Sequence, residues 1–201
     1  MAQKIWLYTA KPEVYIILGG TGDFLIHWDN RTNEEGTLFE DATFGFLQTY
    51  HCRATRSICI EGNVTILIAN SNELTNIDIC HNPKLRILSA HSNRLGSIDI
   101  CNNAALTVVD IHSNHFSAAS LTNLFKALPD NINQENHHLP TSSLDDLFNY
   151  HPAENNERII CIEDNPGLKG CNKTIISEKG WKHPYQNSCH ELFKRFIPVT
   201  K

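Results

Sequence analysis

The chain has 201 residues, of which 41% are hydrophobic and 19% are charged, and its formal net charge is -5. This length accommodates one large or two small domains with a hydrophobic core. The 17 basic and 22 acidic residues form no run or stripe, so we expect no nucleic-acid partner. The longest apolar run, around Val14 to Leu18, is far shorter than the ~18 residues of a membrane span.

Residues 1–62 are predicted to form an N-terminal β cap. Gly19-Gly20-Thr21-Gly22 predicts a hairpin turn, because no helix with Lys-Ser/Thr follows it as a phosphate loop would require. The stretch from Asn30 to Gly36 is polar and is predicted to separate two strands. β-branched and aromatic runs predict the strands themselves at Lys4–Thr9, Val14–Leu18, Phe24–Trp28, Phe46–Cys52 and Arg56–Ile60.

A repeat of 21 residues occupies residues 64–116, where VTILIANSNELTNIDICHNPK is followed by LRILSAHSNRLGSIDICNNAA and LTVVDIHSNHF. The three lines align in columns of one residue type, such as Leu67, Leu88 and Val109 or Asn72, Asn93 and Asn114. These columns are similar to the leucine-rich-repeat pattern L-x-x-L-x-L-x-x-N-x-L. In that pattern the apolar residues of each short strand point inward, the coils stack in parallel ~4.8 Å apart, and each Asn bonds main-chain groups of adjacent coils.

Residues 117–157 are predicted to be a helical insertion. Ser117 is a suitable N-cap, and Pro129 ends the helix. A polar loop from Asp130 to Thr141 and a second short helical turn beginning at Ser143 are expected to follow. The apolar residues on one face of the first helix are Leu121, Leu124, Phe125 and Leu128.

Residues 158–201 are predicted to hold the last coil and a C-terminal cap. Ile160, Ile162 and Asn165 match Leu88, Ala90 and Asn93, which predicts a strand at Ile159–Glu163. Trp181 is expected to cover the open edge of this coil, because a bare edge would template pairing with another chain. The tail from His190 to Lys201 is apolar enough either to dock back onto the body or to reach a partner.

The seven cysteines predict buried thiols and at most one disulfide. Cys80 and Cys101 occupy the same repeat position, and Cys59 and Cys161 lie in predicted strands, so all four are expected to be buried thiols. Cys171 and Cys189 lie outside the repeats and would be able to pair in an oxidising compartment.

The order of these parts resembles that of the secreted or surface leucine-rich-repeat proteins of gut Bacteroidetes, which are loosely internalin-like. Leu25-Ile26-His27-Trp28-Asp29-Asn30 is similar to the I-x-I-D-W-G-D-G segment of their cap, although its glycines are missing here. Thr49-Tyr50-His51 and Ile60-Glu61-Gly62-Asn63-Val64-Thr65 are similar to the segments that lead into their repeats. Asn165-Pro166-Gly167, Cys171-Asn172-Lys173-Thr174-Ile175 and Lys179-Gly180-Trp181 are similar to their closing unit.

The repeat and the resemblance together imply an α/β fold. We expect a short leucine-rich-repeat solenoid with parallel strands over residues 63–201, an N-terminal β-sandwich-like cap over residues 1–62 and a C-terminal capping unit. The resemblance implies a secreted or cell-surface protein whose leader has been removed. No signal peptide is visible at Met1, so a cytoplasmic location is expected if Met1 is the native start.

A row of exposed side chains is expected on the concave side of the strands. An apolar part beside a polar part is typical of a protein interface. We therefore predict noncatalytic recognition or adhesion through this row, by a monomer that binds a protein or surface ligand and needs no cofactor. The 130–157 loop and the tail are the alternative contact sites. The row consists of Ile66, Ile68, Asn70, Ile87, Ser89, His91, Val108, Asp110, His112 and Glu163, with Cys161 beside Glu163.

A small metal-dependent or hydrolytic enzyme is the alternative function. The rings of His91 and His112 are expected roughly 5 Å apart on neighbouring strands, and two imidazoles with the carboxylates of Asp110 and Glu163 are zinc or copper ligands by type. Ser89 lies near Asp110 and His112, yet a flat sheet face offers neither a pocket nor an oxyanion donor pair. The motifs H-E-x-x-H, G-x-S-x-G and the P-loop are absent. We therefore predict no catalytic and no metal-binding residues.

Overall fold

The computed structural model of the chain describes residues 3–28, 32–39, 43–49, 56–130 and 158–184. The strands are β1 (Lys4–Thr9), β2 (Glu13–Trp28), β3 (Thr32–Leu38), β4 (Thr43–Thr49), β5 (Arg56–Ile68), β6 (Asn76–His81), β7 (Ile87–Ser89), β8 (Val108–Asp110), β9 (Arg158–Cys161) and β10 (Trp181–Lys182). The helices are α1 (Ala118–Ala127), the 3-10 helix η2 (Pro166–Lys169) and α3 (Thr174–Glu178).

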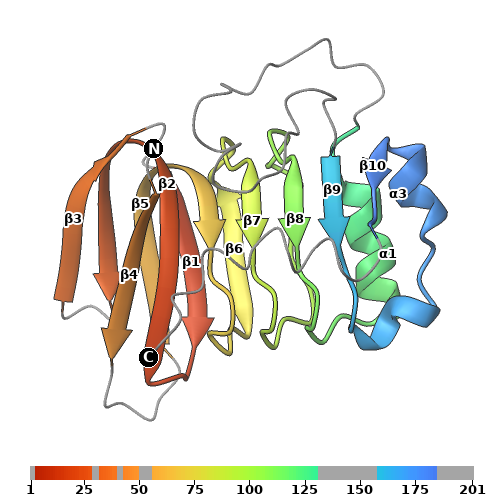
Figure 1. The fold of residues 1–201 in the computed structure, drawn as a ribbon, viewed down its shortest axis with the longest axis horizontal. Helices are drawn as coiled ribbons and strands as arrows, with labels where there is room; N and C mark the ends of the chain where they lie inside the picture. The colour runs from red at the N-terminus through yellow and green to blue at the C-terminus, as the bar shows by residue number, and fades with distance from the viewer. Residues whose placement is uncertain (1–2, 29–31, 40–42, 50–55, 131–157, 185–201) are drawn as a thin grey trace.

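These ten strands form one open mixed sheet, so the described chain is α/β in the broad sense and consists mostly of strands. In Figure 1 the antiparallel strands β2, β3 and β4 lie at one end of the long axis, and α1 and α3 lie at the other. None of the described helices is both long and apolar enough to cross a membrane.

β2 is one strand of 16 residues, where two strands and a hairpin turn were predicted. Its register with β5 shifts between Gly19 and Gly20, and again between Thr21 and Phe24. A Cβ atom on Gly20 would lie 2.2 Å from the carbonyl oxygen of Asn63. The glycines therefore allow two strands to approach closely at an irregular point of the ladder, and the predicted chain reversal is wrong.

Two other strands of the first third differ from prediction. β3 lies in the polar stretch that was predicted to separate strands, and among the described strands it pairs with β2 alone. Leu38 at its end is buried, but residues 33–37 of this edge strand are not, so no apolar alternation marks it in the sequence. β5 runs past its predicted end at Ile60 and across the predicted boundary at residue 62. The sheet is continuous there, and the division into 1–62 and 63–201 stays a prediction.

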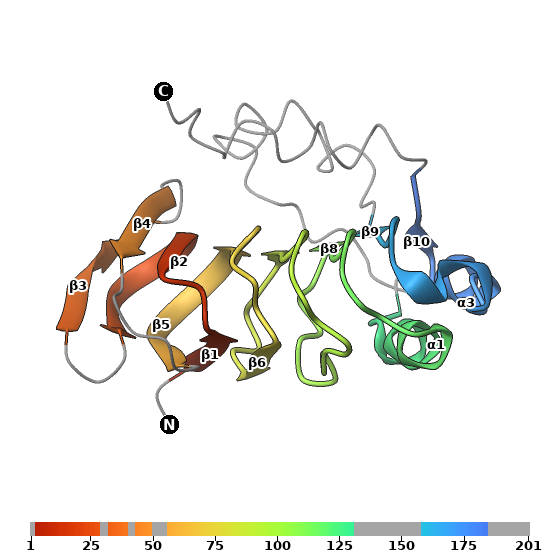
Figure 2. The ribbon, with the colours of Figure 1, turned by 90° about the horizontal axis from the view of Figure 1, so that it is seen from below.

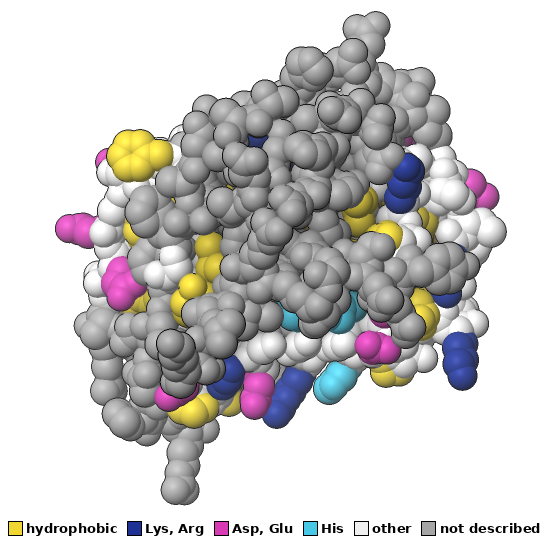
Figure 3. Space-filling view, in the orientation of Figure 1, with side chains coloured by type: hydrophobic (Ala, Val, Ile, Leu, Met, Phe, Trp, Pro, Cys, Tyr) yellow, Lys and Arg dark blue, Asp and Glu magenta, His cyan; other side chains and the backbone are white. Residues whose placement is uncertain are grey.

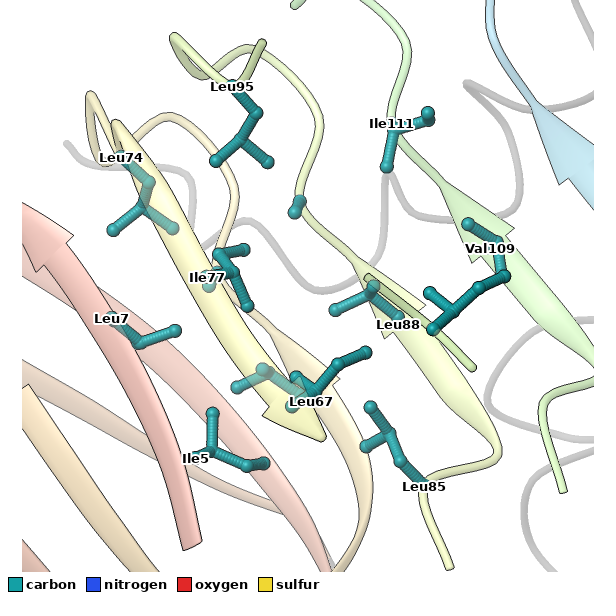
Figure 4. Packing of buried hydrophobic residues seen from close by; sticks show 14 of the residues in the cluster. Ile5, Leu7, Leu67, Leu74, Ile77, Leu85, Leu88, Leu95, Val109 and Ile111 are labelled. Carbon is teal, nitrogen blue, oxygen red and sulfur yellow. The ribbon is translucent and has the colours of Figure 1, made fainter. Parts of the chain in front are cut away.

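β5, β7, β8, β9 and β10 are consecutive parallel neighbours. Leu67 pairs with Leu88, Leu88 with Val109, and Val109 with Ile160, which confirms the predicted columns. Figure 4 shows the first three of these side chains pointing into the same interior as Leu7. Because side chains alternate between the faces of a strand, the residues on either side of this column lie on the opposite face of the sheet.

The predicted role of the asparagine column is also confirmed. Asn93 Nδ2 donates to the carbonyl oxygens of Ala69 and Ala90, both at 2.9 Å. Asn114 and Asn165 repeat this arrangement after β8 and β9. The residue before each of these asparagines has a positive φ of 53–56°, so the chain turns sharply there and the buried amide closes the turn.

The helix predicted after Ser117 is confirmed. The Ser117 hydroxyl accepts a hydrogen bond from the backbone N–H of Ser120 at 3.1 Å, and the four predicted apolar residues are buried. The polar loop, the helical turn predicted at Ser143 and the C-terminal tail lie outside the described residues.

Trp181 lies in β10, which pairs with β9 and extends the sheet by one strand. Its side chain is 3% exposed, and its Nε1 donates to the carbonyl oxygen of Pro129 at 2.8 Å. The Arg158 guanidinium lies 5.8 Å from its ring centroid. Trp181 is thus part of an added edge strand, and Figure 2 shows α3 next to that strand and α1 to one side of the sheet at the same end.

Candidate functional site

The predicted contact residues lie on one face of the parallel strands. Strand pairing aligns Ile66 with Ile87 and Val108, and it aligns Ile68 with Ser89 and Asp110. We call these two rows and their continuation into β9 the strand face, and its polar end consists of Asn70, His91, His112 and Glu163, which follow the strands at the same side. β9 contributes Ile159 and Cys161 to the two rows. Ile159 was not among the predicted contact residues, although it directly precedes Ile160 of the predicted inward column.

The prediction that the strand face is exposed is wrong. Eight of the ten predicted residues are no more than 8% exposed, and only Asn70 and His112 are half-buried. The apolar members form their own hydrophobic cluster with Ile17 and Tyr15 of β2. An aliphatic strip costs about 25 cal/mol per Å² when it is left in water, so the folded chain is stabilised by covering it. Figure 3 shows hydrophobic and histidine side chains on the side of the molecule that faces the viewer in Figure 1.

Two histidines stack at the polar end of the strand face. The ring centroids of His91 and His112 are 4.3 Å apart, close to the predicted separation. His112 Nδ1 lies 2.6 Å from Asp110 Oδ1, and Asp110 is fully buried. Burial lowers the pKa of His112, but the hydrogen bond with Asp110 and the negative charges of Asp110, Glu163 and Asp164 outweigh burial and raise this pKa. The polar end therefore favours a protonated His112.

Ser89 is not placed as a nucleophile. Its hydroxyl donates to Asn70 Oδ1 at 2.8 Å and lies 3.5 Å from Asp110 Oδ2. The carboxylate thus lies between the serine and His112. Activation of a serine requires the opposite order, with the imidazole beside the hydroxyl and the carboxylate behind the imidazole. This arrangement holds the rows together and does not generate an alkoxide.

Glu163 is 6% exposed and contacts groups other than the stacked rings. Its Oε1 lies 3.5 Å from His183 Nδ1, and its Oε2 accepts a hydrogen bond from the backbone N–H of Ile162 at 3.1 Å. His183 was missed, because the short strand that precedes it has no apolar periodicity. Within the described ranges, no three or more His, Cys, Asp or Glu residues gather in a way that could hold a metal ion.

The cysteines differ from prediction. Cys161 is fully buried as predicted, but it is disulfide-bonded and not a free thiol. Cys171 is a free thiol, so the pairing of Cys171 with Cys189 that the sequence left open is not formed. Cys59 is buried and free as predicted. Cys80 is half-buried, because the alternation in β6 places Ile77 and Ile79 inside and Cys80 outside. Cys101 is exposed in a turn. Burial and the nearby Asp99 raise the pKa of Cys80 to about 11, so this thiol is a weak nucleophile.

Two hollows lie away from the strand face. One, of about 880 Å³, is lined by residues of β2, β3 and β5, including Phe24 and Glu61. The other, of about 770 Å³, is lined by turn residues that include His115 and Lys169. Neither hollow is lined by any of the ten predicted contact residues.

Comparisons of the chain with family models, with curated proteins and with solved structures find no match. Its function is therefore argued from the residues and the geometry of the strand face.

Proposed function

We propose that this chain is a noncatalytic recognition module whose strand face is the contact surface for a protein or surface ligand. In this proposal residues 63–201 are a short leucine-rich-repeat solenoid, and the first 62 residues cap it. The parallel register, in which one residue from each coil shares a row, supports the proposal. Rows of this kind present side chains that vary without altering the core, which is how solenoids bind partners.

The composition of the rows supports a protein-like partner. Ile66, Ile87 and Val108 form an apolar strip, and Asn70 and His112 lie at its polar end. An apolar centre with a polar rim is the usual anatomy of a protein interface. Asn70 and His112 are the half-buried members, so a partner would approach the strand face from this end.

Export to the cell surface is part of the proposal. The Cys161 disulfide supports it, because disulfides persist in oxidising compartments and are rare in the cytosol. A monomer is proposed as the active form.

The test compares two histidines that lie three residues apart. His112 belongs to the polar end of the strand face, and His115 is exposed on the turn that follows. We expect His112→Asn, which keeps a side-chain donor near Asp110, to reduce partner capture from host and bacterial surface extracts at least tenfold. His115→Asn should leave capture unchanged. Equal capture by both variants, each shown to be folded by circular dichroism, would remove the strand face as the contact surface.

A further inference from the structure

Two free thiols, Cys80 and Cys101, are held in the same way by two successive repeats. Each follows an aspartate by two residues, and that aspartate's Oδ1 accepts a hydrogen bond from the cysteine's backbone N–H, at 3.0 Å for Cys80 and 2.9 Å for Cys101. The residues directly before them, Ile79 and Ile100, are both buried. Both thiols therefore occupy the same place in their repeats, outside the hydrophobic core.

Hydrogen bonds hold these two segments directly against each other. Asn103 Nδ2 donates to the carbonyl oxygens of Ile79 and Asn82, at 3.0 and 2.8 Å. The Cys80 thiol itself donates to the carbonyl oxygen of Asp99 at 3.9 Å. Extended segments that neighbour each other in this way are ~4.8 Å apart, and a disulfide joins Cα atoms that are ~4.4–6.8 Å apart. The two cysteines are therefore within bridging distance, and the bond requires only rotation of their side chains about χ1.

Each of the two thiols also affects the pKa of the other. Burial raises the pKa of Cys80 to about 11, and the charges of Asp99, Asp78 and Cys101 add to this rise. A hydrogen bond with Asp99 raises the pKa of Cys101, whereas a hydrogen bond with Cys80 opposes that rise. Both thiols are protonated at neutral pH, so they oxidise slowly, because the thiolate is the attacking form. A bond between them is also slow to reduce, because sulfurs with a high pKa are poor leaving groups.

The other free thiols among the described residues are too far away to compete. Cys59 lies on β5, and β1 pairs with β5 on one side and with β6 on the other. Two strand spacings, about 10 Å, therefore separate Cys59 from β6, which exceeds the Cα separation of a disulfide. Cys171 lies between η2 and α3, and Figure 1 shows α3 at the far end of the molecule from β6. Cys80 and Cys101 are thus each other's nearest candidates for pairing.

We propose that Cys80 and Cys101 form an oxidative modification site, at which a small disulfide such as oxidised glutathione converts them to a disulfide that joins two successive repeats. The exposed Cys101, as thiolate, attacks one sulfur of oxidised glutathione, and one glutathione thiolate leaves. The Cys80 thiolate then attacks the Cys101 sulfur of this mixed disulfide and expels the second glutathione thiolate. The two cysteines lose two protons and two electrons, and oxidised glutathione takes up the electrons.

The proposed bond lies on the opposite side of the core from the strand face. Ile79 of β6 and Leu88 of β7 point into the same interior, and Figure 2 shows β6 and β8 on two sides of that interior. Cys80 and the strand face therefore point away from it in different directions. The bond would stabilise the stacking of two repeats and leave the contact surface free. Only its formation in the living cell rests on the proposed export, because oxidants of this class act in oxidising compartments.

The pairing is tested on the full chain by incubation with oxidised glutathione at pH 8.5. A non-reduced digest with a protease that cleaves before Asp separates residues 78–98 from residues 99–109, with one cysteine in each peptide. Mass spectrometry should find these two peptides joined, and reduction should separate them. Their joining should accelerate about tenfold per pH unit from pH 7 to pH 8.5, as the thiolate fraction rises. Glutathione that stays attached to both cysteines, or a bond between two chains on a non-reducing gel, would overturn the proposal.

Two serine variants provide the controls. Cys101→Ser, at an exposed position, should abolish the joined peptides, and Cys171→Ser should leave them unchanged. After the same oxidation, the wild type should unfold about 5–10 °C above Cys101→Ser, because the bond closes a loop of about 20 residues. Equal thermal midpoints would overturn the stabilising role of the bond. None of these measurements uses a partner, so they stand if partner capture fails, and the two proposals can fail separately.

Discussion

Replacing Asn93 by Ala should destabilise the fold more than any surface substitution in the repeats. Asn93 is 5% exposed, and its Oδ1 accepts hydrogen bonds from the backbone N–H groups of Asn72 and Leu74, at 2.9 and 3.0 Å. The substitution leaves these two buried donors without an acceptor. Each such group costs about 1–3 kcal/mol, so we expect a loss of about 2–6 kcal/mol in the free energy of unfolding.

Urea unfolding, followed by tryptophan fluorescence and by circular dichroism, measures this loss. With an m-value of about 2 kcal/mol per M, the midpoint should fall by about 1–3 M without a change in m. Asn114→Ala should cost about half as much, because among the described residues its Oδ1 accepts one backbone N–H, that of Leu95. The exposed Asn102 is the matched control, and Asn102→Ala should change stability by less than about 0.5 kcal/mol.

Equal shifts of the midpoint in Asn93→Ala and Asn102→Ala would mean that water or a local rearrangement satisfies the two donors. The asparagine column would then be a sequence pattern without an energetic role in joining neighbouring strands.

Two further predictions concern the polar end and the closing unit. Because the pKa of His112 is raised above 6.5 in the folded chain, the stability it contributes is full below pH 6.5 and is lost as the pH rises through the folded value. The stability difference between wild type and His112→Asn should therefore shrink from pH 5.5 to pH 8.5 in urea titrations, and a constant difference would contradict the raised pKa. Gly167→Ala should lower stability by about 1–3 kcal/mol or more, because its Cβ would lie 2.1 Å from the Ser117 carbonyl carbon. Gly96→Ala, whose Cβ meets nothing within 4 Å, should change the thermal midpoint little, and equal effects at both glycines would refute the clash.

The sequence predicts the parallel strands well because two constraints coincide there. The inward column through Leu67, Leu88 and Val109 repeats every 21 residues, and one residue of slippage would turn every side chain to the other face. Asn93 and Asn114 fix the same register independently, through main-chain hydrogen bonds. Because the apolar column and the asparagine hydrogen bonds require the same register, only one alignment of the parallel strands satisfies both.

The first third is harder to predict, because its determinants are not local. A sequence such as Gly19-Gly20-Thr21-Gly22 forms a turn in most settings. Here glycine is needed for a different reason, because Asn63 of β5 approaches the backbone of Gly20 closely. β3 has no apolar alternation, so neither propensity nor periodicity could find it. The disulfide of Cys161 likewise cannot be predicted from the spacing of cysteines in the sequence, because it depends on which parts of the chain become neighbours.

Periodicity also shows which side chains share a face without showing what lies above that face. This distinction matters for recognition, because an external partner competes with whatever already covers Ile87 and Val108. If about one molecule in a hundred exposed the strand face, the apparent Kd would be about 100-fold weaker than the intrinsic value. In the proposed module a partner therefore gains most by first contacting the half-buried His112 and Asn70.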